Sequence, residues 1–463
     1  MVEDTSSPKQ FPHSPFVPYD PAVQLYEVPA WSLGGYADAW EYTGWRDETM
    51  SWKTTASIHG HLNPSPTVRL SGPDALRFLS SVCVNGFRKF PVGTSRHAIM
   101  TDDSGNVATH GMLLRLGEEE FITYWLAPYL NYRLAQQPDL DVVAEDLTGQ
   151  VFLFQIAGPR SLEILEAAAE ENLHDIRFLG HRKTTVAGAE LTIARVGMAG
   201  SLAYELHGPV EHAVRVYDAI LAAGKEYGIR QLGIKAYMCN HTEGGFPQGY
   251  YHFPYPWGED EQLQEFLASI GFPPIGRDLV LRGSVGPDLK RRYRTPFQLG
   301  WGHVVRFDHE FPGRAALERE AAADESRMVT LVWNPEDIAE VFLSQFRPGE
   351  EHPDMELPNH FMYGTGDPQH RQVLWADRVL ANGRDIGTSS GRCYTYYSRE
   401  MLSLATVETA FAEEGTEVVV LWGDPGTNQK EIRATVARFP YLTDPVRNEK
   451  ADVSTIPSRY PAR

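Results

Sequence analysis

The sequence predicts an α+β fold in which a mixed helix-and-strand body is followed by a separate β-rich domain. Three observations support this prediction. The chain has 463 residues, too many for one hydrophobic core, which indicates two or three domains. Helical and strand-like patterns are interleaved up to about residue 295, which is typical of an α+β body. Beyond that point short strand-like segments are separated by turn residues, which indicates a β domain of barrel type.

The elements of the body follow from the spacing of its apolar residues. Trp45 and Trp52 are seven positions apart and therefore share one face of a helix over residues 45–52. We expect a strand at 67–71, a helix that begins near Pro73, and a β-meander over 96–125. A second set follows, with a strand at 151–157, a helix at 159–170, a strand at 187–196, a glycine-rich loop at 197–208 and a helix at 211–227.

The C-terminal part is expected to contain six strands, at residues 302–308, 328–333, 373–380, 402–407, 417–422 and 431–438. Together these patterns divide the chain into four parts. We expect an extended arm over residues 1–30, a body of two interleaved subdomains over 31–295, a β-rich domain over 296–443 and a polar tail over 444–463.

Composition excludes several classes of protein. The formal net charge of −19 argues against nucleic acid and anionic membranes as partners, because both require a basic surface. No run of about 18 apolar residues is present, so no membrane span is expected, and the acidic start does not resemble a signal peptide. Cys83, Cys239 and Cys393 are far apart and odd in number, which fits neither a disulfide framework nor a zinc site. We therefore expect a cytoplasmic protein.

Polar side chains are concentrated between Gly233 and Phe246, where Lys235, Tyr237 and Glu243 stand close together. Such groups are unfavourable to bury unless they bind each other or a ligand. A solvated connection is the alternative interpretation. His59 and His61 are two positions apart in an extended segment and point the same way. They are interpreted as a polar pair that faces a pocket, rather than as metal ligands, because no third ligand is nearby.

Several motifs occur in a fixed order between about residues 45 and 440. They are Gly158-Pro159 before a helix, Gly197-x-x-Gly200-x-x-x-Tyr204-Glu205, and Phe311-Pro-Gly-Arg314. Their order and spacing resemble the glycine-cleavage T-protein family. Two further motifs are similar to the tetrahydrofolate-dependent aryl O-demethylases of that family, the vanillate and syringate type: Trp45-Arg-x-Glu48-x-x-x-Trp52 and Ala236-Tyr237-x-x-Asn240-x-x-Glu243.

The resemblance implies a clover-like, three-part body around a central hole, which tetrahydrofolate and the methyl donor enter from opposite sides. It also implies a set of site residues. Glu205 resembles the carboxylate that binds the pterin ring, Gln155 lines the same pocket, and Phe246 stands where a ring stacks on the folate. Tyr237 resembles a residue central to the chemistry and to folate binding. The substrate end is expected to include His59, His61, Tyr36, Arg96, His97 and Trp257.

The expected chemistry is methyl transfer from a methoxylated aromatic compound to N5 of tetrahydrofolate. The nucleophile belongs to the folate, so the protein has to align the reactants and to donate a proton to the departing phenolate. Tyr237 and His61 have side chains suited to that donation. No metal, flavin or haem is required by this reaction.

Two departures from the family pattern bear on the substrate. Residues 106–110 of the meander offer no acidic side chain, although T-proteins carry one there. Residues 120–126 offer no basic side chain, although vanillate-type enzymes use one to hold the substrate carboxylate. If the substrate carries a carboxylate, we expect Arg96, His97 or a histidine of the 59–61 segment to bind it.

Two alternatives remain beside the O-demethylase. One is an aminomethyl- or N-methyl-transferring enzyme of glycine, sarcosine or dimethylglycine metabolism, which the missing meander carboxylate disfavours. The other is a folate-binding protein without turnover, which would have no need for the aromatic residues around Tyr237.

Overall fold

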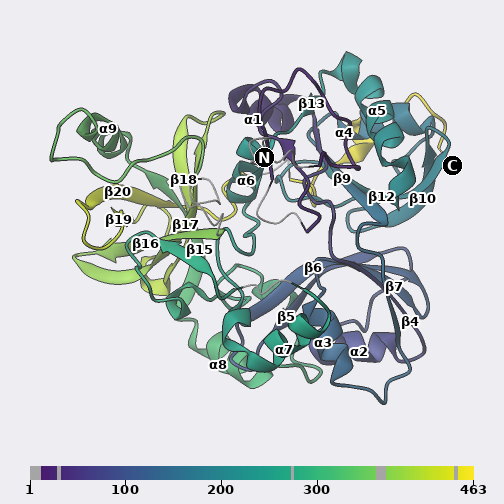
Figure 1. Ribbon diagram of the computed structural model, residues 1–463, viewed down its shortest axis with the longest axis horizontal. Helices are drawn as coiled ribbons and strands as arrows, with labels where there is room; N and C mark the ends of the chain where they lie inside the picture. Colours follow the sequence, from purple (N-terminus) through teal and green to yellow (C-terminus); the bar gives the residue numbers. More distant parts are fainter. Residues whose placement is uncertain (1–11, 29–32, 273–275, 361–371, 443–446, 463) are drawn as a thin grey trace, which may run out of the picture.

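The computed structural model describes residues 12–28, 33–272, 276–360, 372–442 and 447–462. Three lobes surround a common centre in Figure 1, and each lobe is built on its own β-sheet. Helices cover the sheets of two lobes, so the predicted α+β class is confirmed.

The first lobe contains a six-stranded sheet in the order β10-β11-β12-β9-β3-β13. Its strands are β3 (Ser57–His59), β9 (Val151–Ala157), β10 (His181–Val186), β11 (Ala189–Ala194), β12 (Ala203–Pro209) and β13 (Arg230–Gln231). Helices α4 (Ser161–Ala169) and α5 (Ala213–Gly224) pack against each other on this sheet. The loop predicted over 197–208 is therefore wrong in its second half, because β12 pairs with β9 on one side and β11 on the other.

The second lobe contains a five-stranded sheet in the order β5-β6-β7-β4-β8. Its strands are β4 (Thr67–Ser71), β5 (Ser95–Thr101), β6 (Val107–Gly117), β7 (Glu120–Tyr124) and β8 (Val143–Asp146). Strands β5, β6 and β7 pair antiparallel in succession, which confirms the predicted meander. Helices α2 (Ala75–Val82), α3 (Tyr129–Ala135), α7 (Glu261–Ser269) and α8 (Arg314–Ala323) contribute to the core of this lobe and lie beside its sheet in Figure 1.

The third lobe is a closed β-barrel. Strands β16, β17, β18, β15, β20 and β19 pair in that order, and β19 pairs again with β16, which confirms the expected barrel. Their bounds are β15 (Ser326–Trp333), β16 (Gln372–Ala381), β17 (Arg384–Thr395), β18 (Glu400–Glu408), β19 (Glu417–Trp422) and β20 (Lys430–Ala437). Strand β14 (Leu279–Arg282) precedes residue 296, the predicted start of this domain, but pairs with β16. Helix α9 (Pro335–Ser344) lies on the outside of the barrel.

One predicted strand of this region is wrong. Residues 302–308 begin with a 3-10 turn at Gly302–Val304, and Val305 makes only an isolated bridge with Asn85. Strand β17 lies in the middle of the barrel sheet and was not predicted.

Two helices lie between the lobes. Helix α1 (Trp45–Thr54) packs on helix α6 (Ile234–Gly244), and α6 also contacts β17 of the barrel. Helix α6 therefore joins the first lobe to the third, close to the centre of the molecule (Figure 1).

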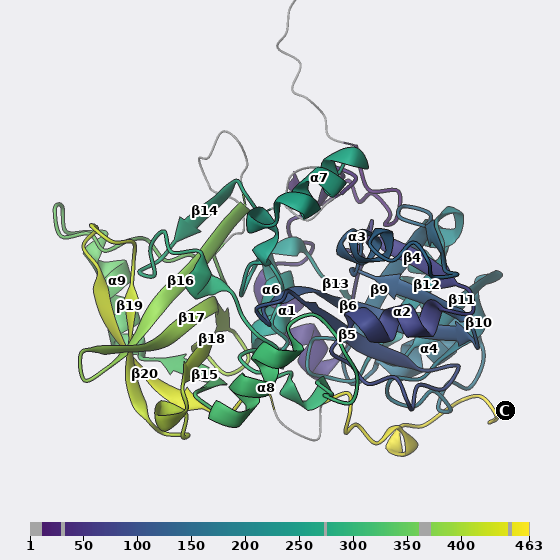
Figure 2. The same ribbon diagram turned by 90° about the horizontal axis from the view of Figure 1, so that it is seen from below.

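The two ends of the chain pack on the body where the structure describes them. Phe16 of the N-terminal arm is 1% exposed and belongs to the core of the first lobe. After the barrel the chain runs back across the body to the first lobe, as Figure 2 shows. Arg195 holds this C-terminal segment by donating to the carbonyl oxygens of Asn448 and Ala451 at 2.9 and 2.7 Å.

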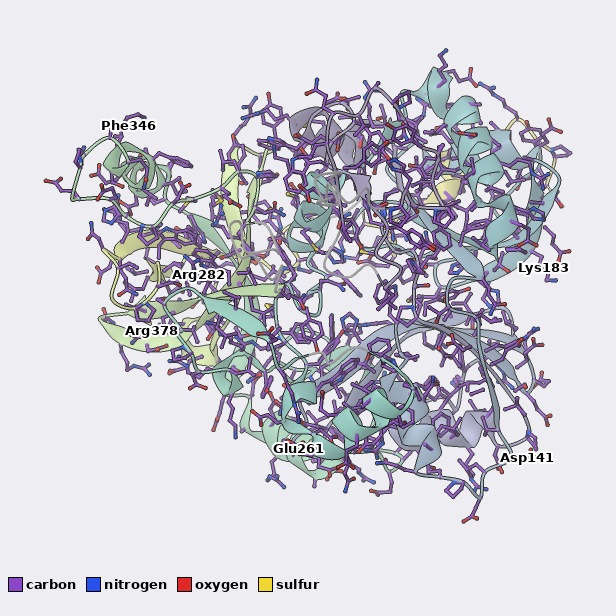
Figure 3. All side chains as sticks on the ribbon, in the orientation of Figure 1. Asp141, Lys183, Glu261, Arg282, Phe346 and Arg378 are labelled. Carbon is purple, nitrogen blue, oxygen red and sulfur yellow. The ribbon has the colours of Figure 1, made fainter. Side chains whose placement is uncertain are left out.

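Charged and apolar residues mark the outer limits of the lobes in Figure 3, where Asp141, Lys183 and Phe346 lie on the periphery. Phe346 is 83% exposed beyond helix α9, far from the centre. In the part of the chain that the structure describes, no helix is long and apolar enough to cross a membrane.

Candidate active site between the lobes

A large cavity of about 540 Å³ opens between the lobes. We call it the first cavity. Its polar lining includes Glu205, Arg96, His97, His110, Arg447 and Glu449, and its apolar lining includes Leu62, Trp125, Met198, Phe246 and Trp301. The first two lobes, the segment directly after the barrel and the C-terminal segment contribute to it, so the cavity exists only in the assembled molecule.

A second, smaller cavity of about 170 Å³ adjoins the first. Leu62, Trp125, Gln248 and Tyr255 line both, which shows that the two cavities share a wall. Its further lining includes His61, Thr109, Tyr237, Met238, Tyr250 and Trp257. Two molecules bound in the two cavities would meet at this wall.

Glu205 is a buried carboxylate placed by the pairing of β12 with β9. Its cross-strand partner is Gln155, whose Nε2 donates to Glu205 Oε1 at 3.3 Å. The other oxygen, Oε2, lies 3.5 Å from Nε2 of His207 and makes no hydrogen bond within the described residues. A carboxylate oxygen left in this state accepts readily from a ligand N–H. The 2-amino–N3 edge of a pterin presents such donors, so this end of the first cavity fits a pterin.

Tyr237 lies between the two cavities. Its ring lines the second cavity, and its hydroxyl is 3.6 Å from Sδ of Met198, which lines the first. Burial, with a smaller contribution from the charge of Glu205, raises the pKa of Tyr237 above its ordinary value of 10.0. The phenol therefore keeps its proton at neutral pH and can donate it.

His59 and His61 both pack against the Tyr237 ring, with ring centroids 4.9 and 5.3 Å away. His61 lines the second cavity, whereas both nitrogens of its ring face protein acceptors: Nδ1 lies 3.2 Å from Asp38 Oδ2, and Nε2 lies 2.6 Å from the carbonyl oxygen of Leu232. Burial lowers the pKa of His59 well below 6.5, and the neighbouring His61 adds to the effect. His59 lines neither cavity and packs against the ring of Tyr237.

Helix α1 holds both ends of helix α6, which carries Tyr237. At the start of α6, Glu48 Oε2 accepts a hydrogen bond from Gly233 N at 2.8 Å. Near its end, Glu243 Oε2 accepts from Trp52 Nε1 at 3.1 Å and lies 2.7 Å from Nζ of Lys53. The first demethylase-like motif therefore has a structural explanation, because its residues Glu48 and Trp52 fix the position of α6.

Phe246 stands in a group of aromatic and imidazole rings on the wall of the first cavity. The ring centroids of His97 and Trp301 lie 5.1 and 5.8 Å from its own. His97 Nε2 and His110 Nδ1 are 3.1 Å apart, and burial lowers the pKa of His97 to about 3. These imidazoles are neutral, and within the described ranges no group of three or more His, Cys, Asp or Glu side chains could hold a metal ion.

The predicted substrate residues fall in different places. Trp257 and His61 line the second cavity, whereas Arg96 and His97 line the first. Tyr36 packs against Phe16, with ring centroids 6.3 Å apart, and lines neither cavity.

Several residues of the site were not predicted from the sequence, among them Trp301, His110 and Tyr250. Met198 and Trp125 stand on the wall near Tyr237, and Arg447 reaches the first cavity from the C-terminal segment. Trp125 has a positive φ of 70°, a conformation with no local signal in the sequence. Arg447 follows a polar stretch that resembles any solvated tail.

Comparisons with known proteins agree with this architecture. A family model described as the GCVT N-terminal domain matches residues 22–250. The solved structure of glycine cleavage system aminomethyltransferase T from Bartonella henselae matches with a TM-score of 0.64 at 16% identity, over 91% of this chain and 95% of that one. At this identity the match shows the fold alone, and it confirms the three-part T-protein body.

Two relatives are closer in sequence. Sesamin methylene transferase from Sinomonas sp. (strain No.22) is 46% identical over 423 residues, which cover 90% of this chain and 93% of that protein. Syringate O-demethylase from Sphingobium sp. (strain NBRC 103272 / SYK-6) is 30% identical over 424 residues, which cover 87% of this chain and 89% of that protein. The chain therefore belongs to the GCVT family of enzymes, the aminomethyltransferase or glycine-cleavage T-protein family.

Proposed function

We propose that this enzyme transfers a one-carbon group from an aryl ether to N5 of tetrahydrofolate. The observation that supports this most strongly is the pair of adjoining cavities, with Tyr237 lining the second and its hydroxyl 3.6 Å from Sδ of Met198, which lines the first. A transfer between two bound molecules requires them to meet with the reacting atoms aligned, and a well-held alignment alone can supply about 7–11 kcal/mol of rate enhancement.

The first cavity is assigned to tetrahydrofolate. Glu205 binds the pterin edge, Phe246 packs against the folate, and Arg96 and Arg447 offer positive charge for the folate carboxylates. Gln155, which was expected to line the same pocket, lines neither cavity and instead holds the Glu205 carboxylate. This assignment moves Arg96 and His97 from the aromatic substrate to the folate side. When bound, tetrahydrofolate supplies the nucleophilic amine and carries the one-carbon group away.

The second cavity is assigned to the arene. Trp257 and Tyr250 offer ring faces on its wall, and Tyr237 stands where the two cavities adjoin. In the reaction the bond between the carbon and the aryl oxygen breaks, and its electron pair stays on the oxygen. The hydroxyl of Tyr237 donates a hydrogen bond to that oxygen, and the bond strengthens as negative charge develops there. His59 and His61 hold the tyrosine ring in place.

Two forms of this reaction fit the site. A methoxy group would give a phenol and 5-methyltetrahydrofolate, the form expected from the sequence. A methylene group held between two aryl oxygens would give a catechol and 5,10-methylenetetrahydrofolate, because both carbon–oxygen bonds would break, the carbon would become bonded to N5 and N10, and the two protons lost from these nitrogens would end on the two oxygens. The second form is supported by the 46% identity to a protein named for methylene transfer. Both forms leave the oxidation state of the transferred carbon unchanged.

The two alternatives from the sequence are less well supported by the site. An amine substrate calls for an anionic partner, and the second cavity has no acidic residue in its described lining. A binding protein without turnover has no use for a second cavity next to the first.

One experiment tests the proposal. Purified protein is incubated with tetrahydrofolate and either 1,2-dimethoxybenzene or 1,3-benzodioxole, and folate products are separated by mass. We expect 5-methyltetrahydrofolate from the first arene or 5,10-methylenetetrahydrofolate from the second, and neither product without protein. Absence of both folate products with these two arenes and with methoxyphenols would contradict the proposed function.

A further inference from the structure

Trp125 and Tyr250 share three unusual features. Both line the second cavity. Both have a positive φ, 70° for Trp125 and 60° for Tyr250. Both also carry a buried polar atom, Trp125 Nε1 and Tyr250 Oη, that has no hydrogen-bond partner among the described residues.

The positive φ and the buried polar atom without a partner are each unfavourable for the protein. A bulky aromatic residue in the left-handed region is strained, and such residues cluster at ligand-binding positions. A buried N–H or O–H without a partner has lost its water without gaining a replacement. Their coincidence in two residues of one small cavity indicates that the missing partner is a ligand.

The chemistry of these groups restricts what that ligand offers. An indole N–H donates and cannot accept, so the atom opposite Trp125 must be an acceptor. A tyrosine hydroxyl can donate as well, and burial raises the pKa of Tyr250 well above 10.0, so it keeps its proton. Two donors on residues that line the second cavity, one of which, Trp125, also lines the first, are suited to the oxygen atoms of the ligand.

Charge restricts the ligand further. The described residues that line the second cavity include no Lys, Arg, Asp or Glu. A carboxylate bound there would be desolvated without a counter-ion, which is strongly unfavourable. Arg96, the arginine expected to bind a substrate carboxylate, lines the first cavity, where its Nη1 and Nη2 donate to backbone carbonyls of Ser95 and Lys89.

We propose that the substrate is an uncharged arene with at least two oxygen substituents, and that Trp125 and Tyr250 bind the ether or hydroxyl oxygen other than the one to which Tyr237 donates. This inference rests on the proposed function and names the substrate class of the same site. It makes Trp125 and Tyr250 specificity-determining residues, distinct from Tyr237, which acts on the oxygen that leaves.

Three probes separate charge from oxygen count. They are 1,2-dimethoxybenzene, 3,4-dimethoxybenzoate and methoxybenzene. Binding of each to the protein is measured by calorimetry in the absence of folate, and turnover is measured with tetrahydrofolate. We expect 1,2-dimethoxybenzene to bind about 100-fold more tightly than 3,4-dimethoxybenzoate, because the carboxylate has no partner.

The variants Trp125→Phe and Tyr250→Phe each remove one donor and keep the ring. Each should raise the Kd for 1,2-dimethoxybenzene about three- to tenfold, the value of one neutral hydrogen bond. For methoxybenzene, which lacks the second oxygen, the Kd should change less than twofold. Tyr293→Phe serves as a control, because the Tyr293 hydroxyl donates to Glu259 outside both cavities.

The outcomes distinguish this inference from the proposed function. Equal binding of the benzoate and the neutral arene would overturn the inference even if one-carbon transfer occurs. So would variants that weaken both neutral arenes equally. If the arenes bind in the expected order without forming any folate product, the inference holds for binding and the proposed function fails. If Trp125→Phe does not fold, Tyr250→Phe carries the same test.

Discussion

Glu205 lies in the wall of the larger cavity and has one oxygen that accepts no hydrogen bond from the described residues. Gln155 holds the other oxygen and so fixes the plane of the carboxylate. This arrangement prepares a hydrogen-bond acceptor before any ligand arrives, which limits the entropy lost on binding.

Replacing Glu205 should therefore weaken folate binding specifically. We expect Glu205→Ala to reduce the affinity for tetrahydrofolate by about 1.5–3 kcal/mol, the range for hydrogen bonds to a charged group. Calorimetric titration measures the change. Glu190→Ala is the matched control on the neighbouring strand, where Glu190 makes an exposed ion pair with Lys183. Equal affinities of the Glu205 variant and the wild type would remove Glu205 from the folate site.

Tyr237 is the residue on which the proposed chemistry depends. Tyr237→Phe keeps the ring packing and removes only the hydroxyl, so kcat should fall by about 10²–10³ while folate affinity changes little. Because its pKa is raised above 10.0, loss of the Tyr237 proton should cause no decline in kcat between pH 7 and about pH 9. Tyr204→Phe is the control, since the Tyr204 hydroxyl is buried away from both cavities. A near wild-type rate for Tyr237→Phe, with an unchanged melting temperature, would make Tyr237 structural.

At the scale of elements, helix α1 acts as a brace for helix α6. The pair of Lys53 and Glu243 is almost fully buried, with 7% and 1% of the side chains exposed. Removing one partner leaves a buried charge, which typically destabilises a protein by about 3–5 kcal/mol. We expect that loss of unfolding free energy for Lys53→Met in urea denaturation. The double variant Lys53→Met/Glu243→Gln removes both charges and should recover most of the loss. A double variant no more stable than the single one would show that the ion pair is not the cause.

The sequence predicted elements well where strands contain runs of apolar residues bounded by turn residues, as in the meander and in strands β15, β18 and β19. It failed at β17, whose Gly387 faces the backbone of β18 so closely that a Cβ would lie 2.2 Å from the carbonyl oxygen of Thr406. Pairing on both sides makes β17 a strand, and composition does not reveal it. The Val-Val-Arg-Phe pattern near residue 305 failed in the opposite way, because among the described residues it pairs only through the single bridge between Val305 and Asn85.

The same limit applies to the site. The positions of Glu205 and Tyr237 followed from a resemblance of motifs, whereas their surroundings could not be inferred. Which cavity Arg96 faces depends on the packing of three lobes, and the strained backbone of Trp125 depends on its neighbours. Glu205 also lies on a strand rather than in the predicted loop, and this pairing with Gln155 is what orients its carboxylate.

At the scale of the whole molecule, buried neutral histidines make stability depend on pH. Burial lowers the pKa of His97 to about 3, of His241 to about 4 and of His360 to about 3. Below the unfolded value of 6.5 the unfolded chain takes up protons that the native protein does not, so stability is present above pH 6.5 and declines as the pH falls from there towards 4. Each such histidine contributes up to about 1.4 kcal/mol per pH unit.

We therefore expect the unfolding free energy to decrease steeply between pH 6.5 and pH 5. His360→Asn should flatten that slope by about one proton's share, about 1.4 kcal/mol per pH unit. His360 stacks on Tyr251 and lines neither cavity. Urea titrations of both proteins at several pH values measure the difference. Identical slopes would show that His360 titrates alike in the folded and unfolded chains.

The make-up of the first cavity has a consequence for engineering this protein. The family model ends at residue 250, yet the cavity wall also includes Trp301, Phe439 and Arg447. A fragment cut at the end of the matched domain would therefore carry Glu205 and Tyr237 but lack one side of the folate pocket. For the same reason, a chimera that takes only the matched domain from a relative would combine cavity residues from two proteins that can bind different ligands. A working chimera therefore has to exchange the segment around Trp301 and the segment after the barrel, which carries Phe439 and Arg447, together with the matched domain.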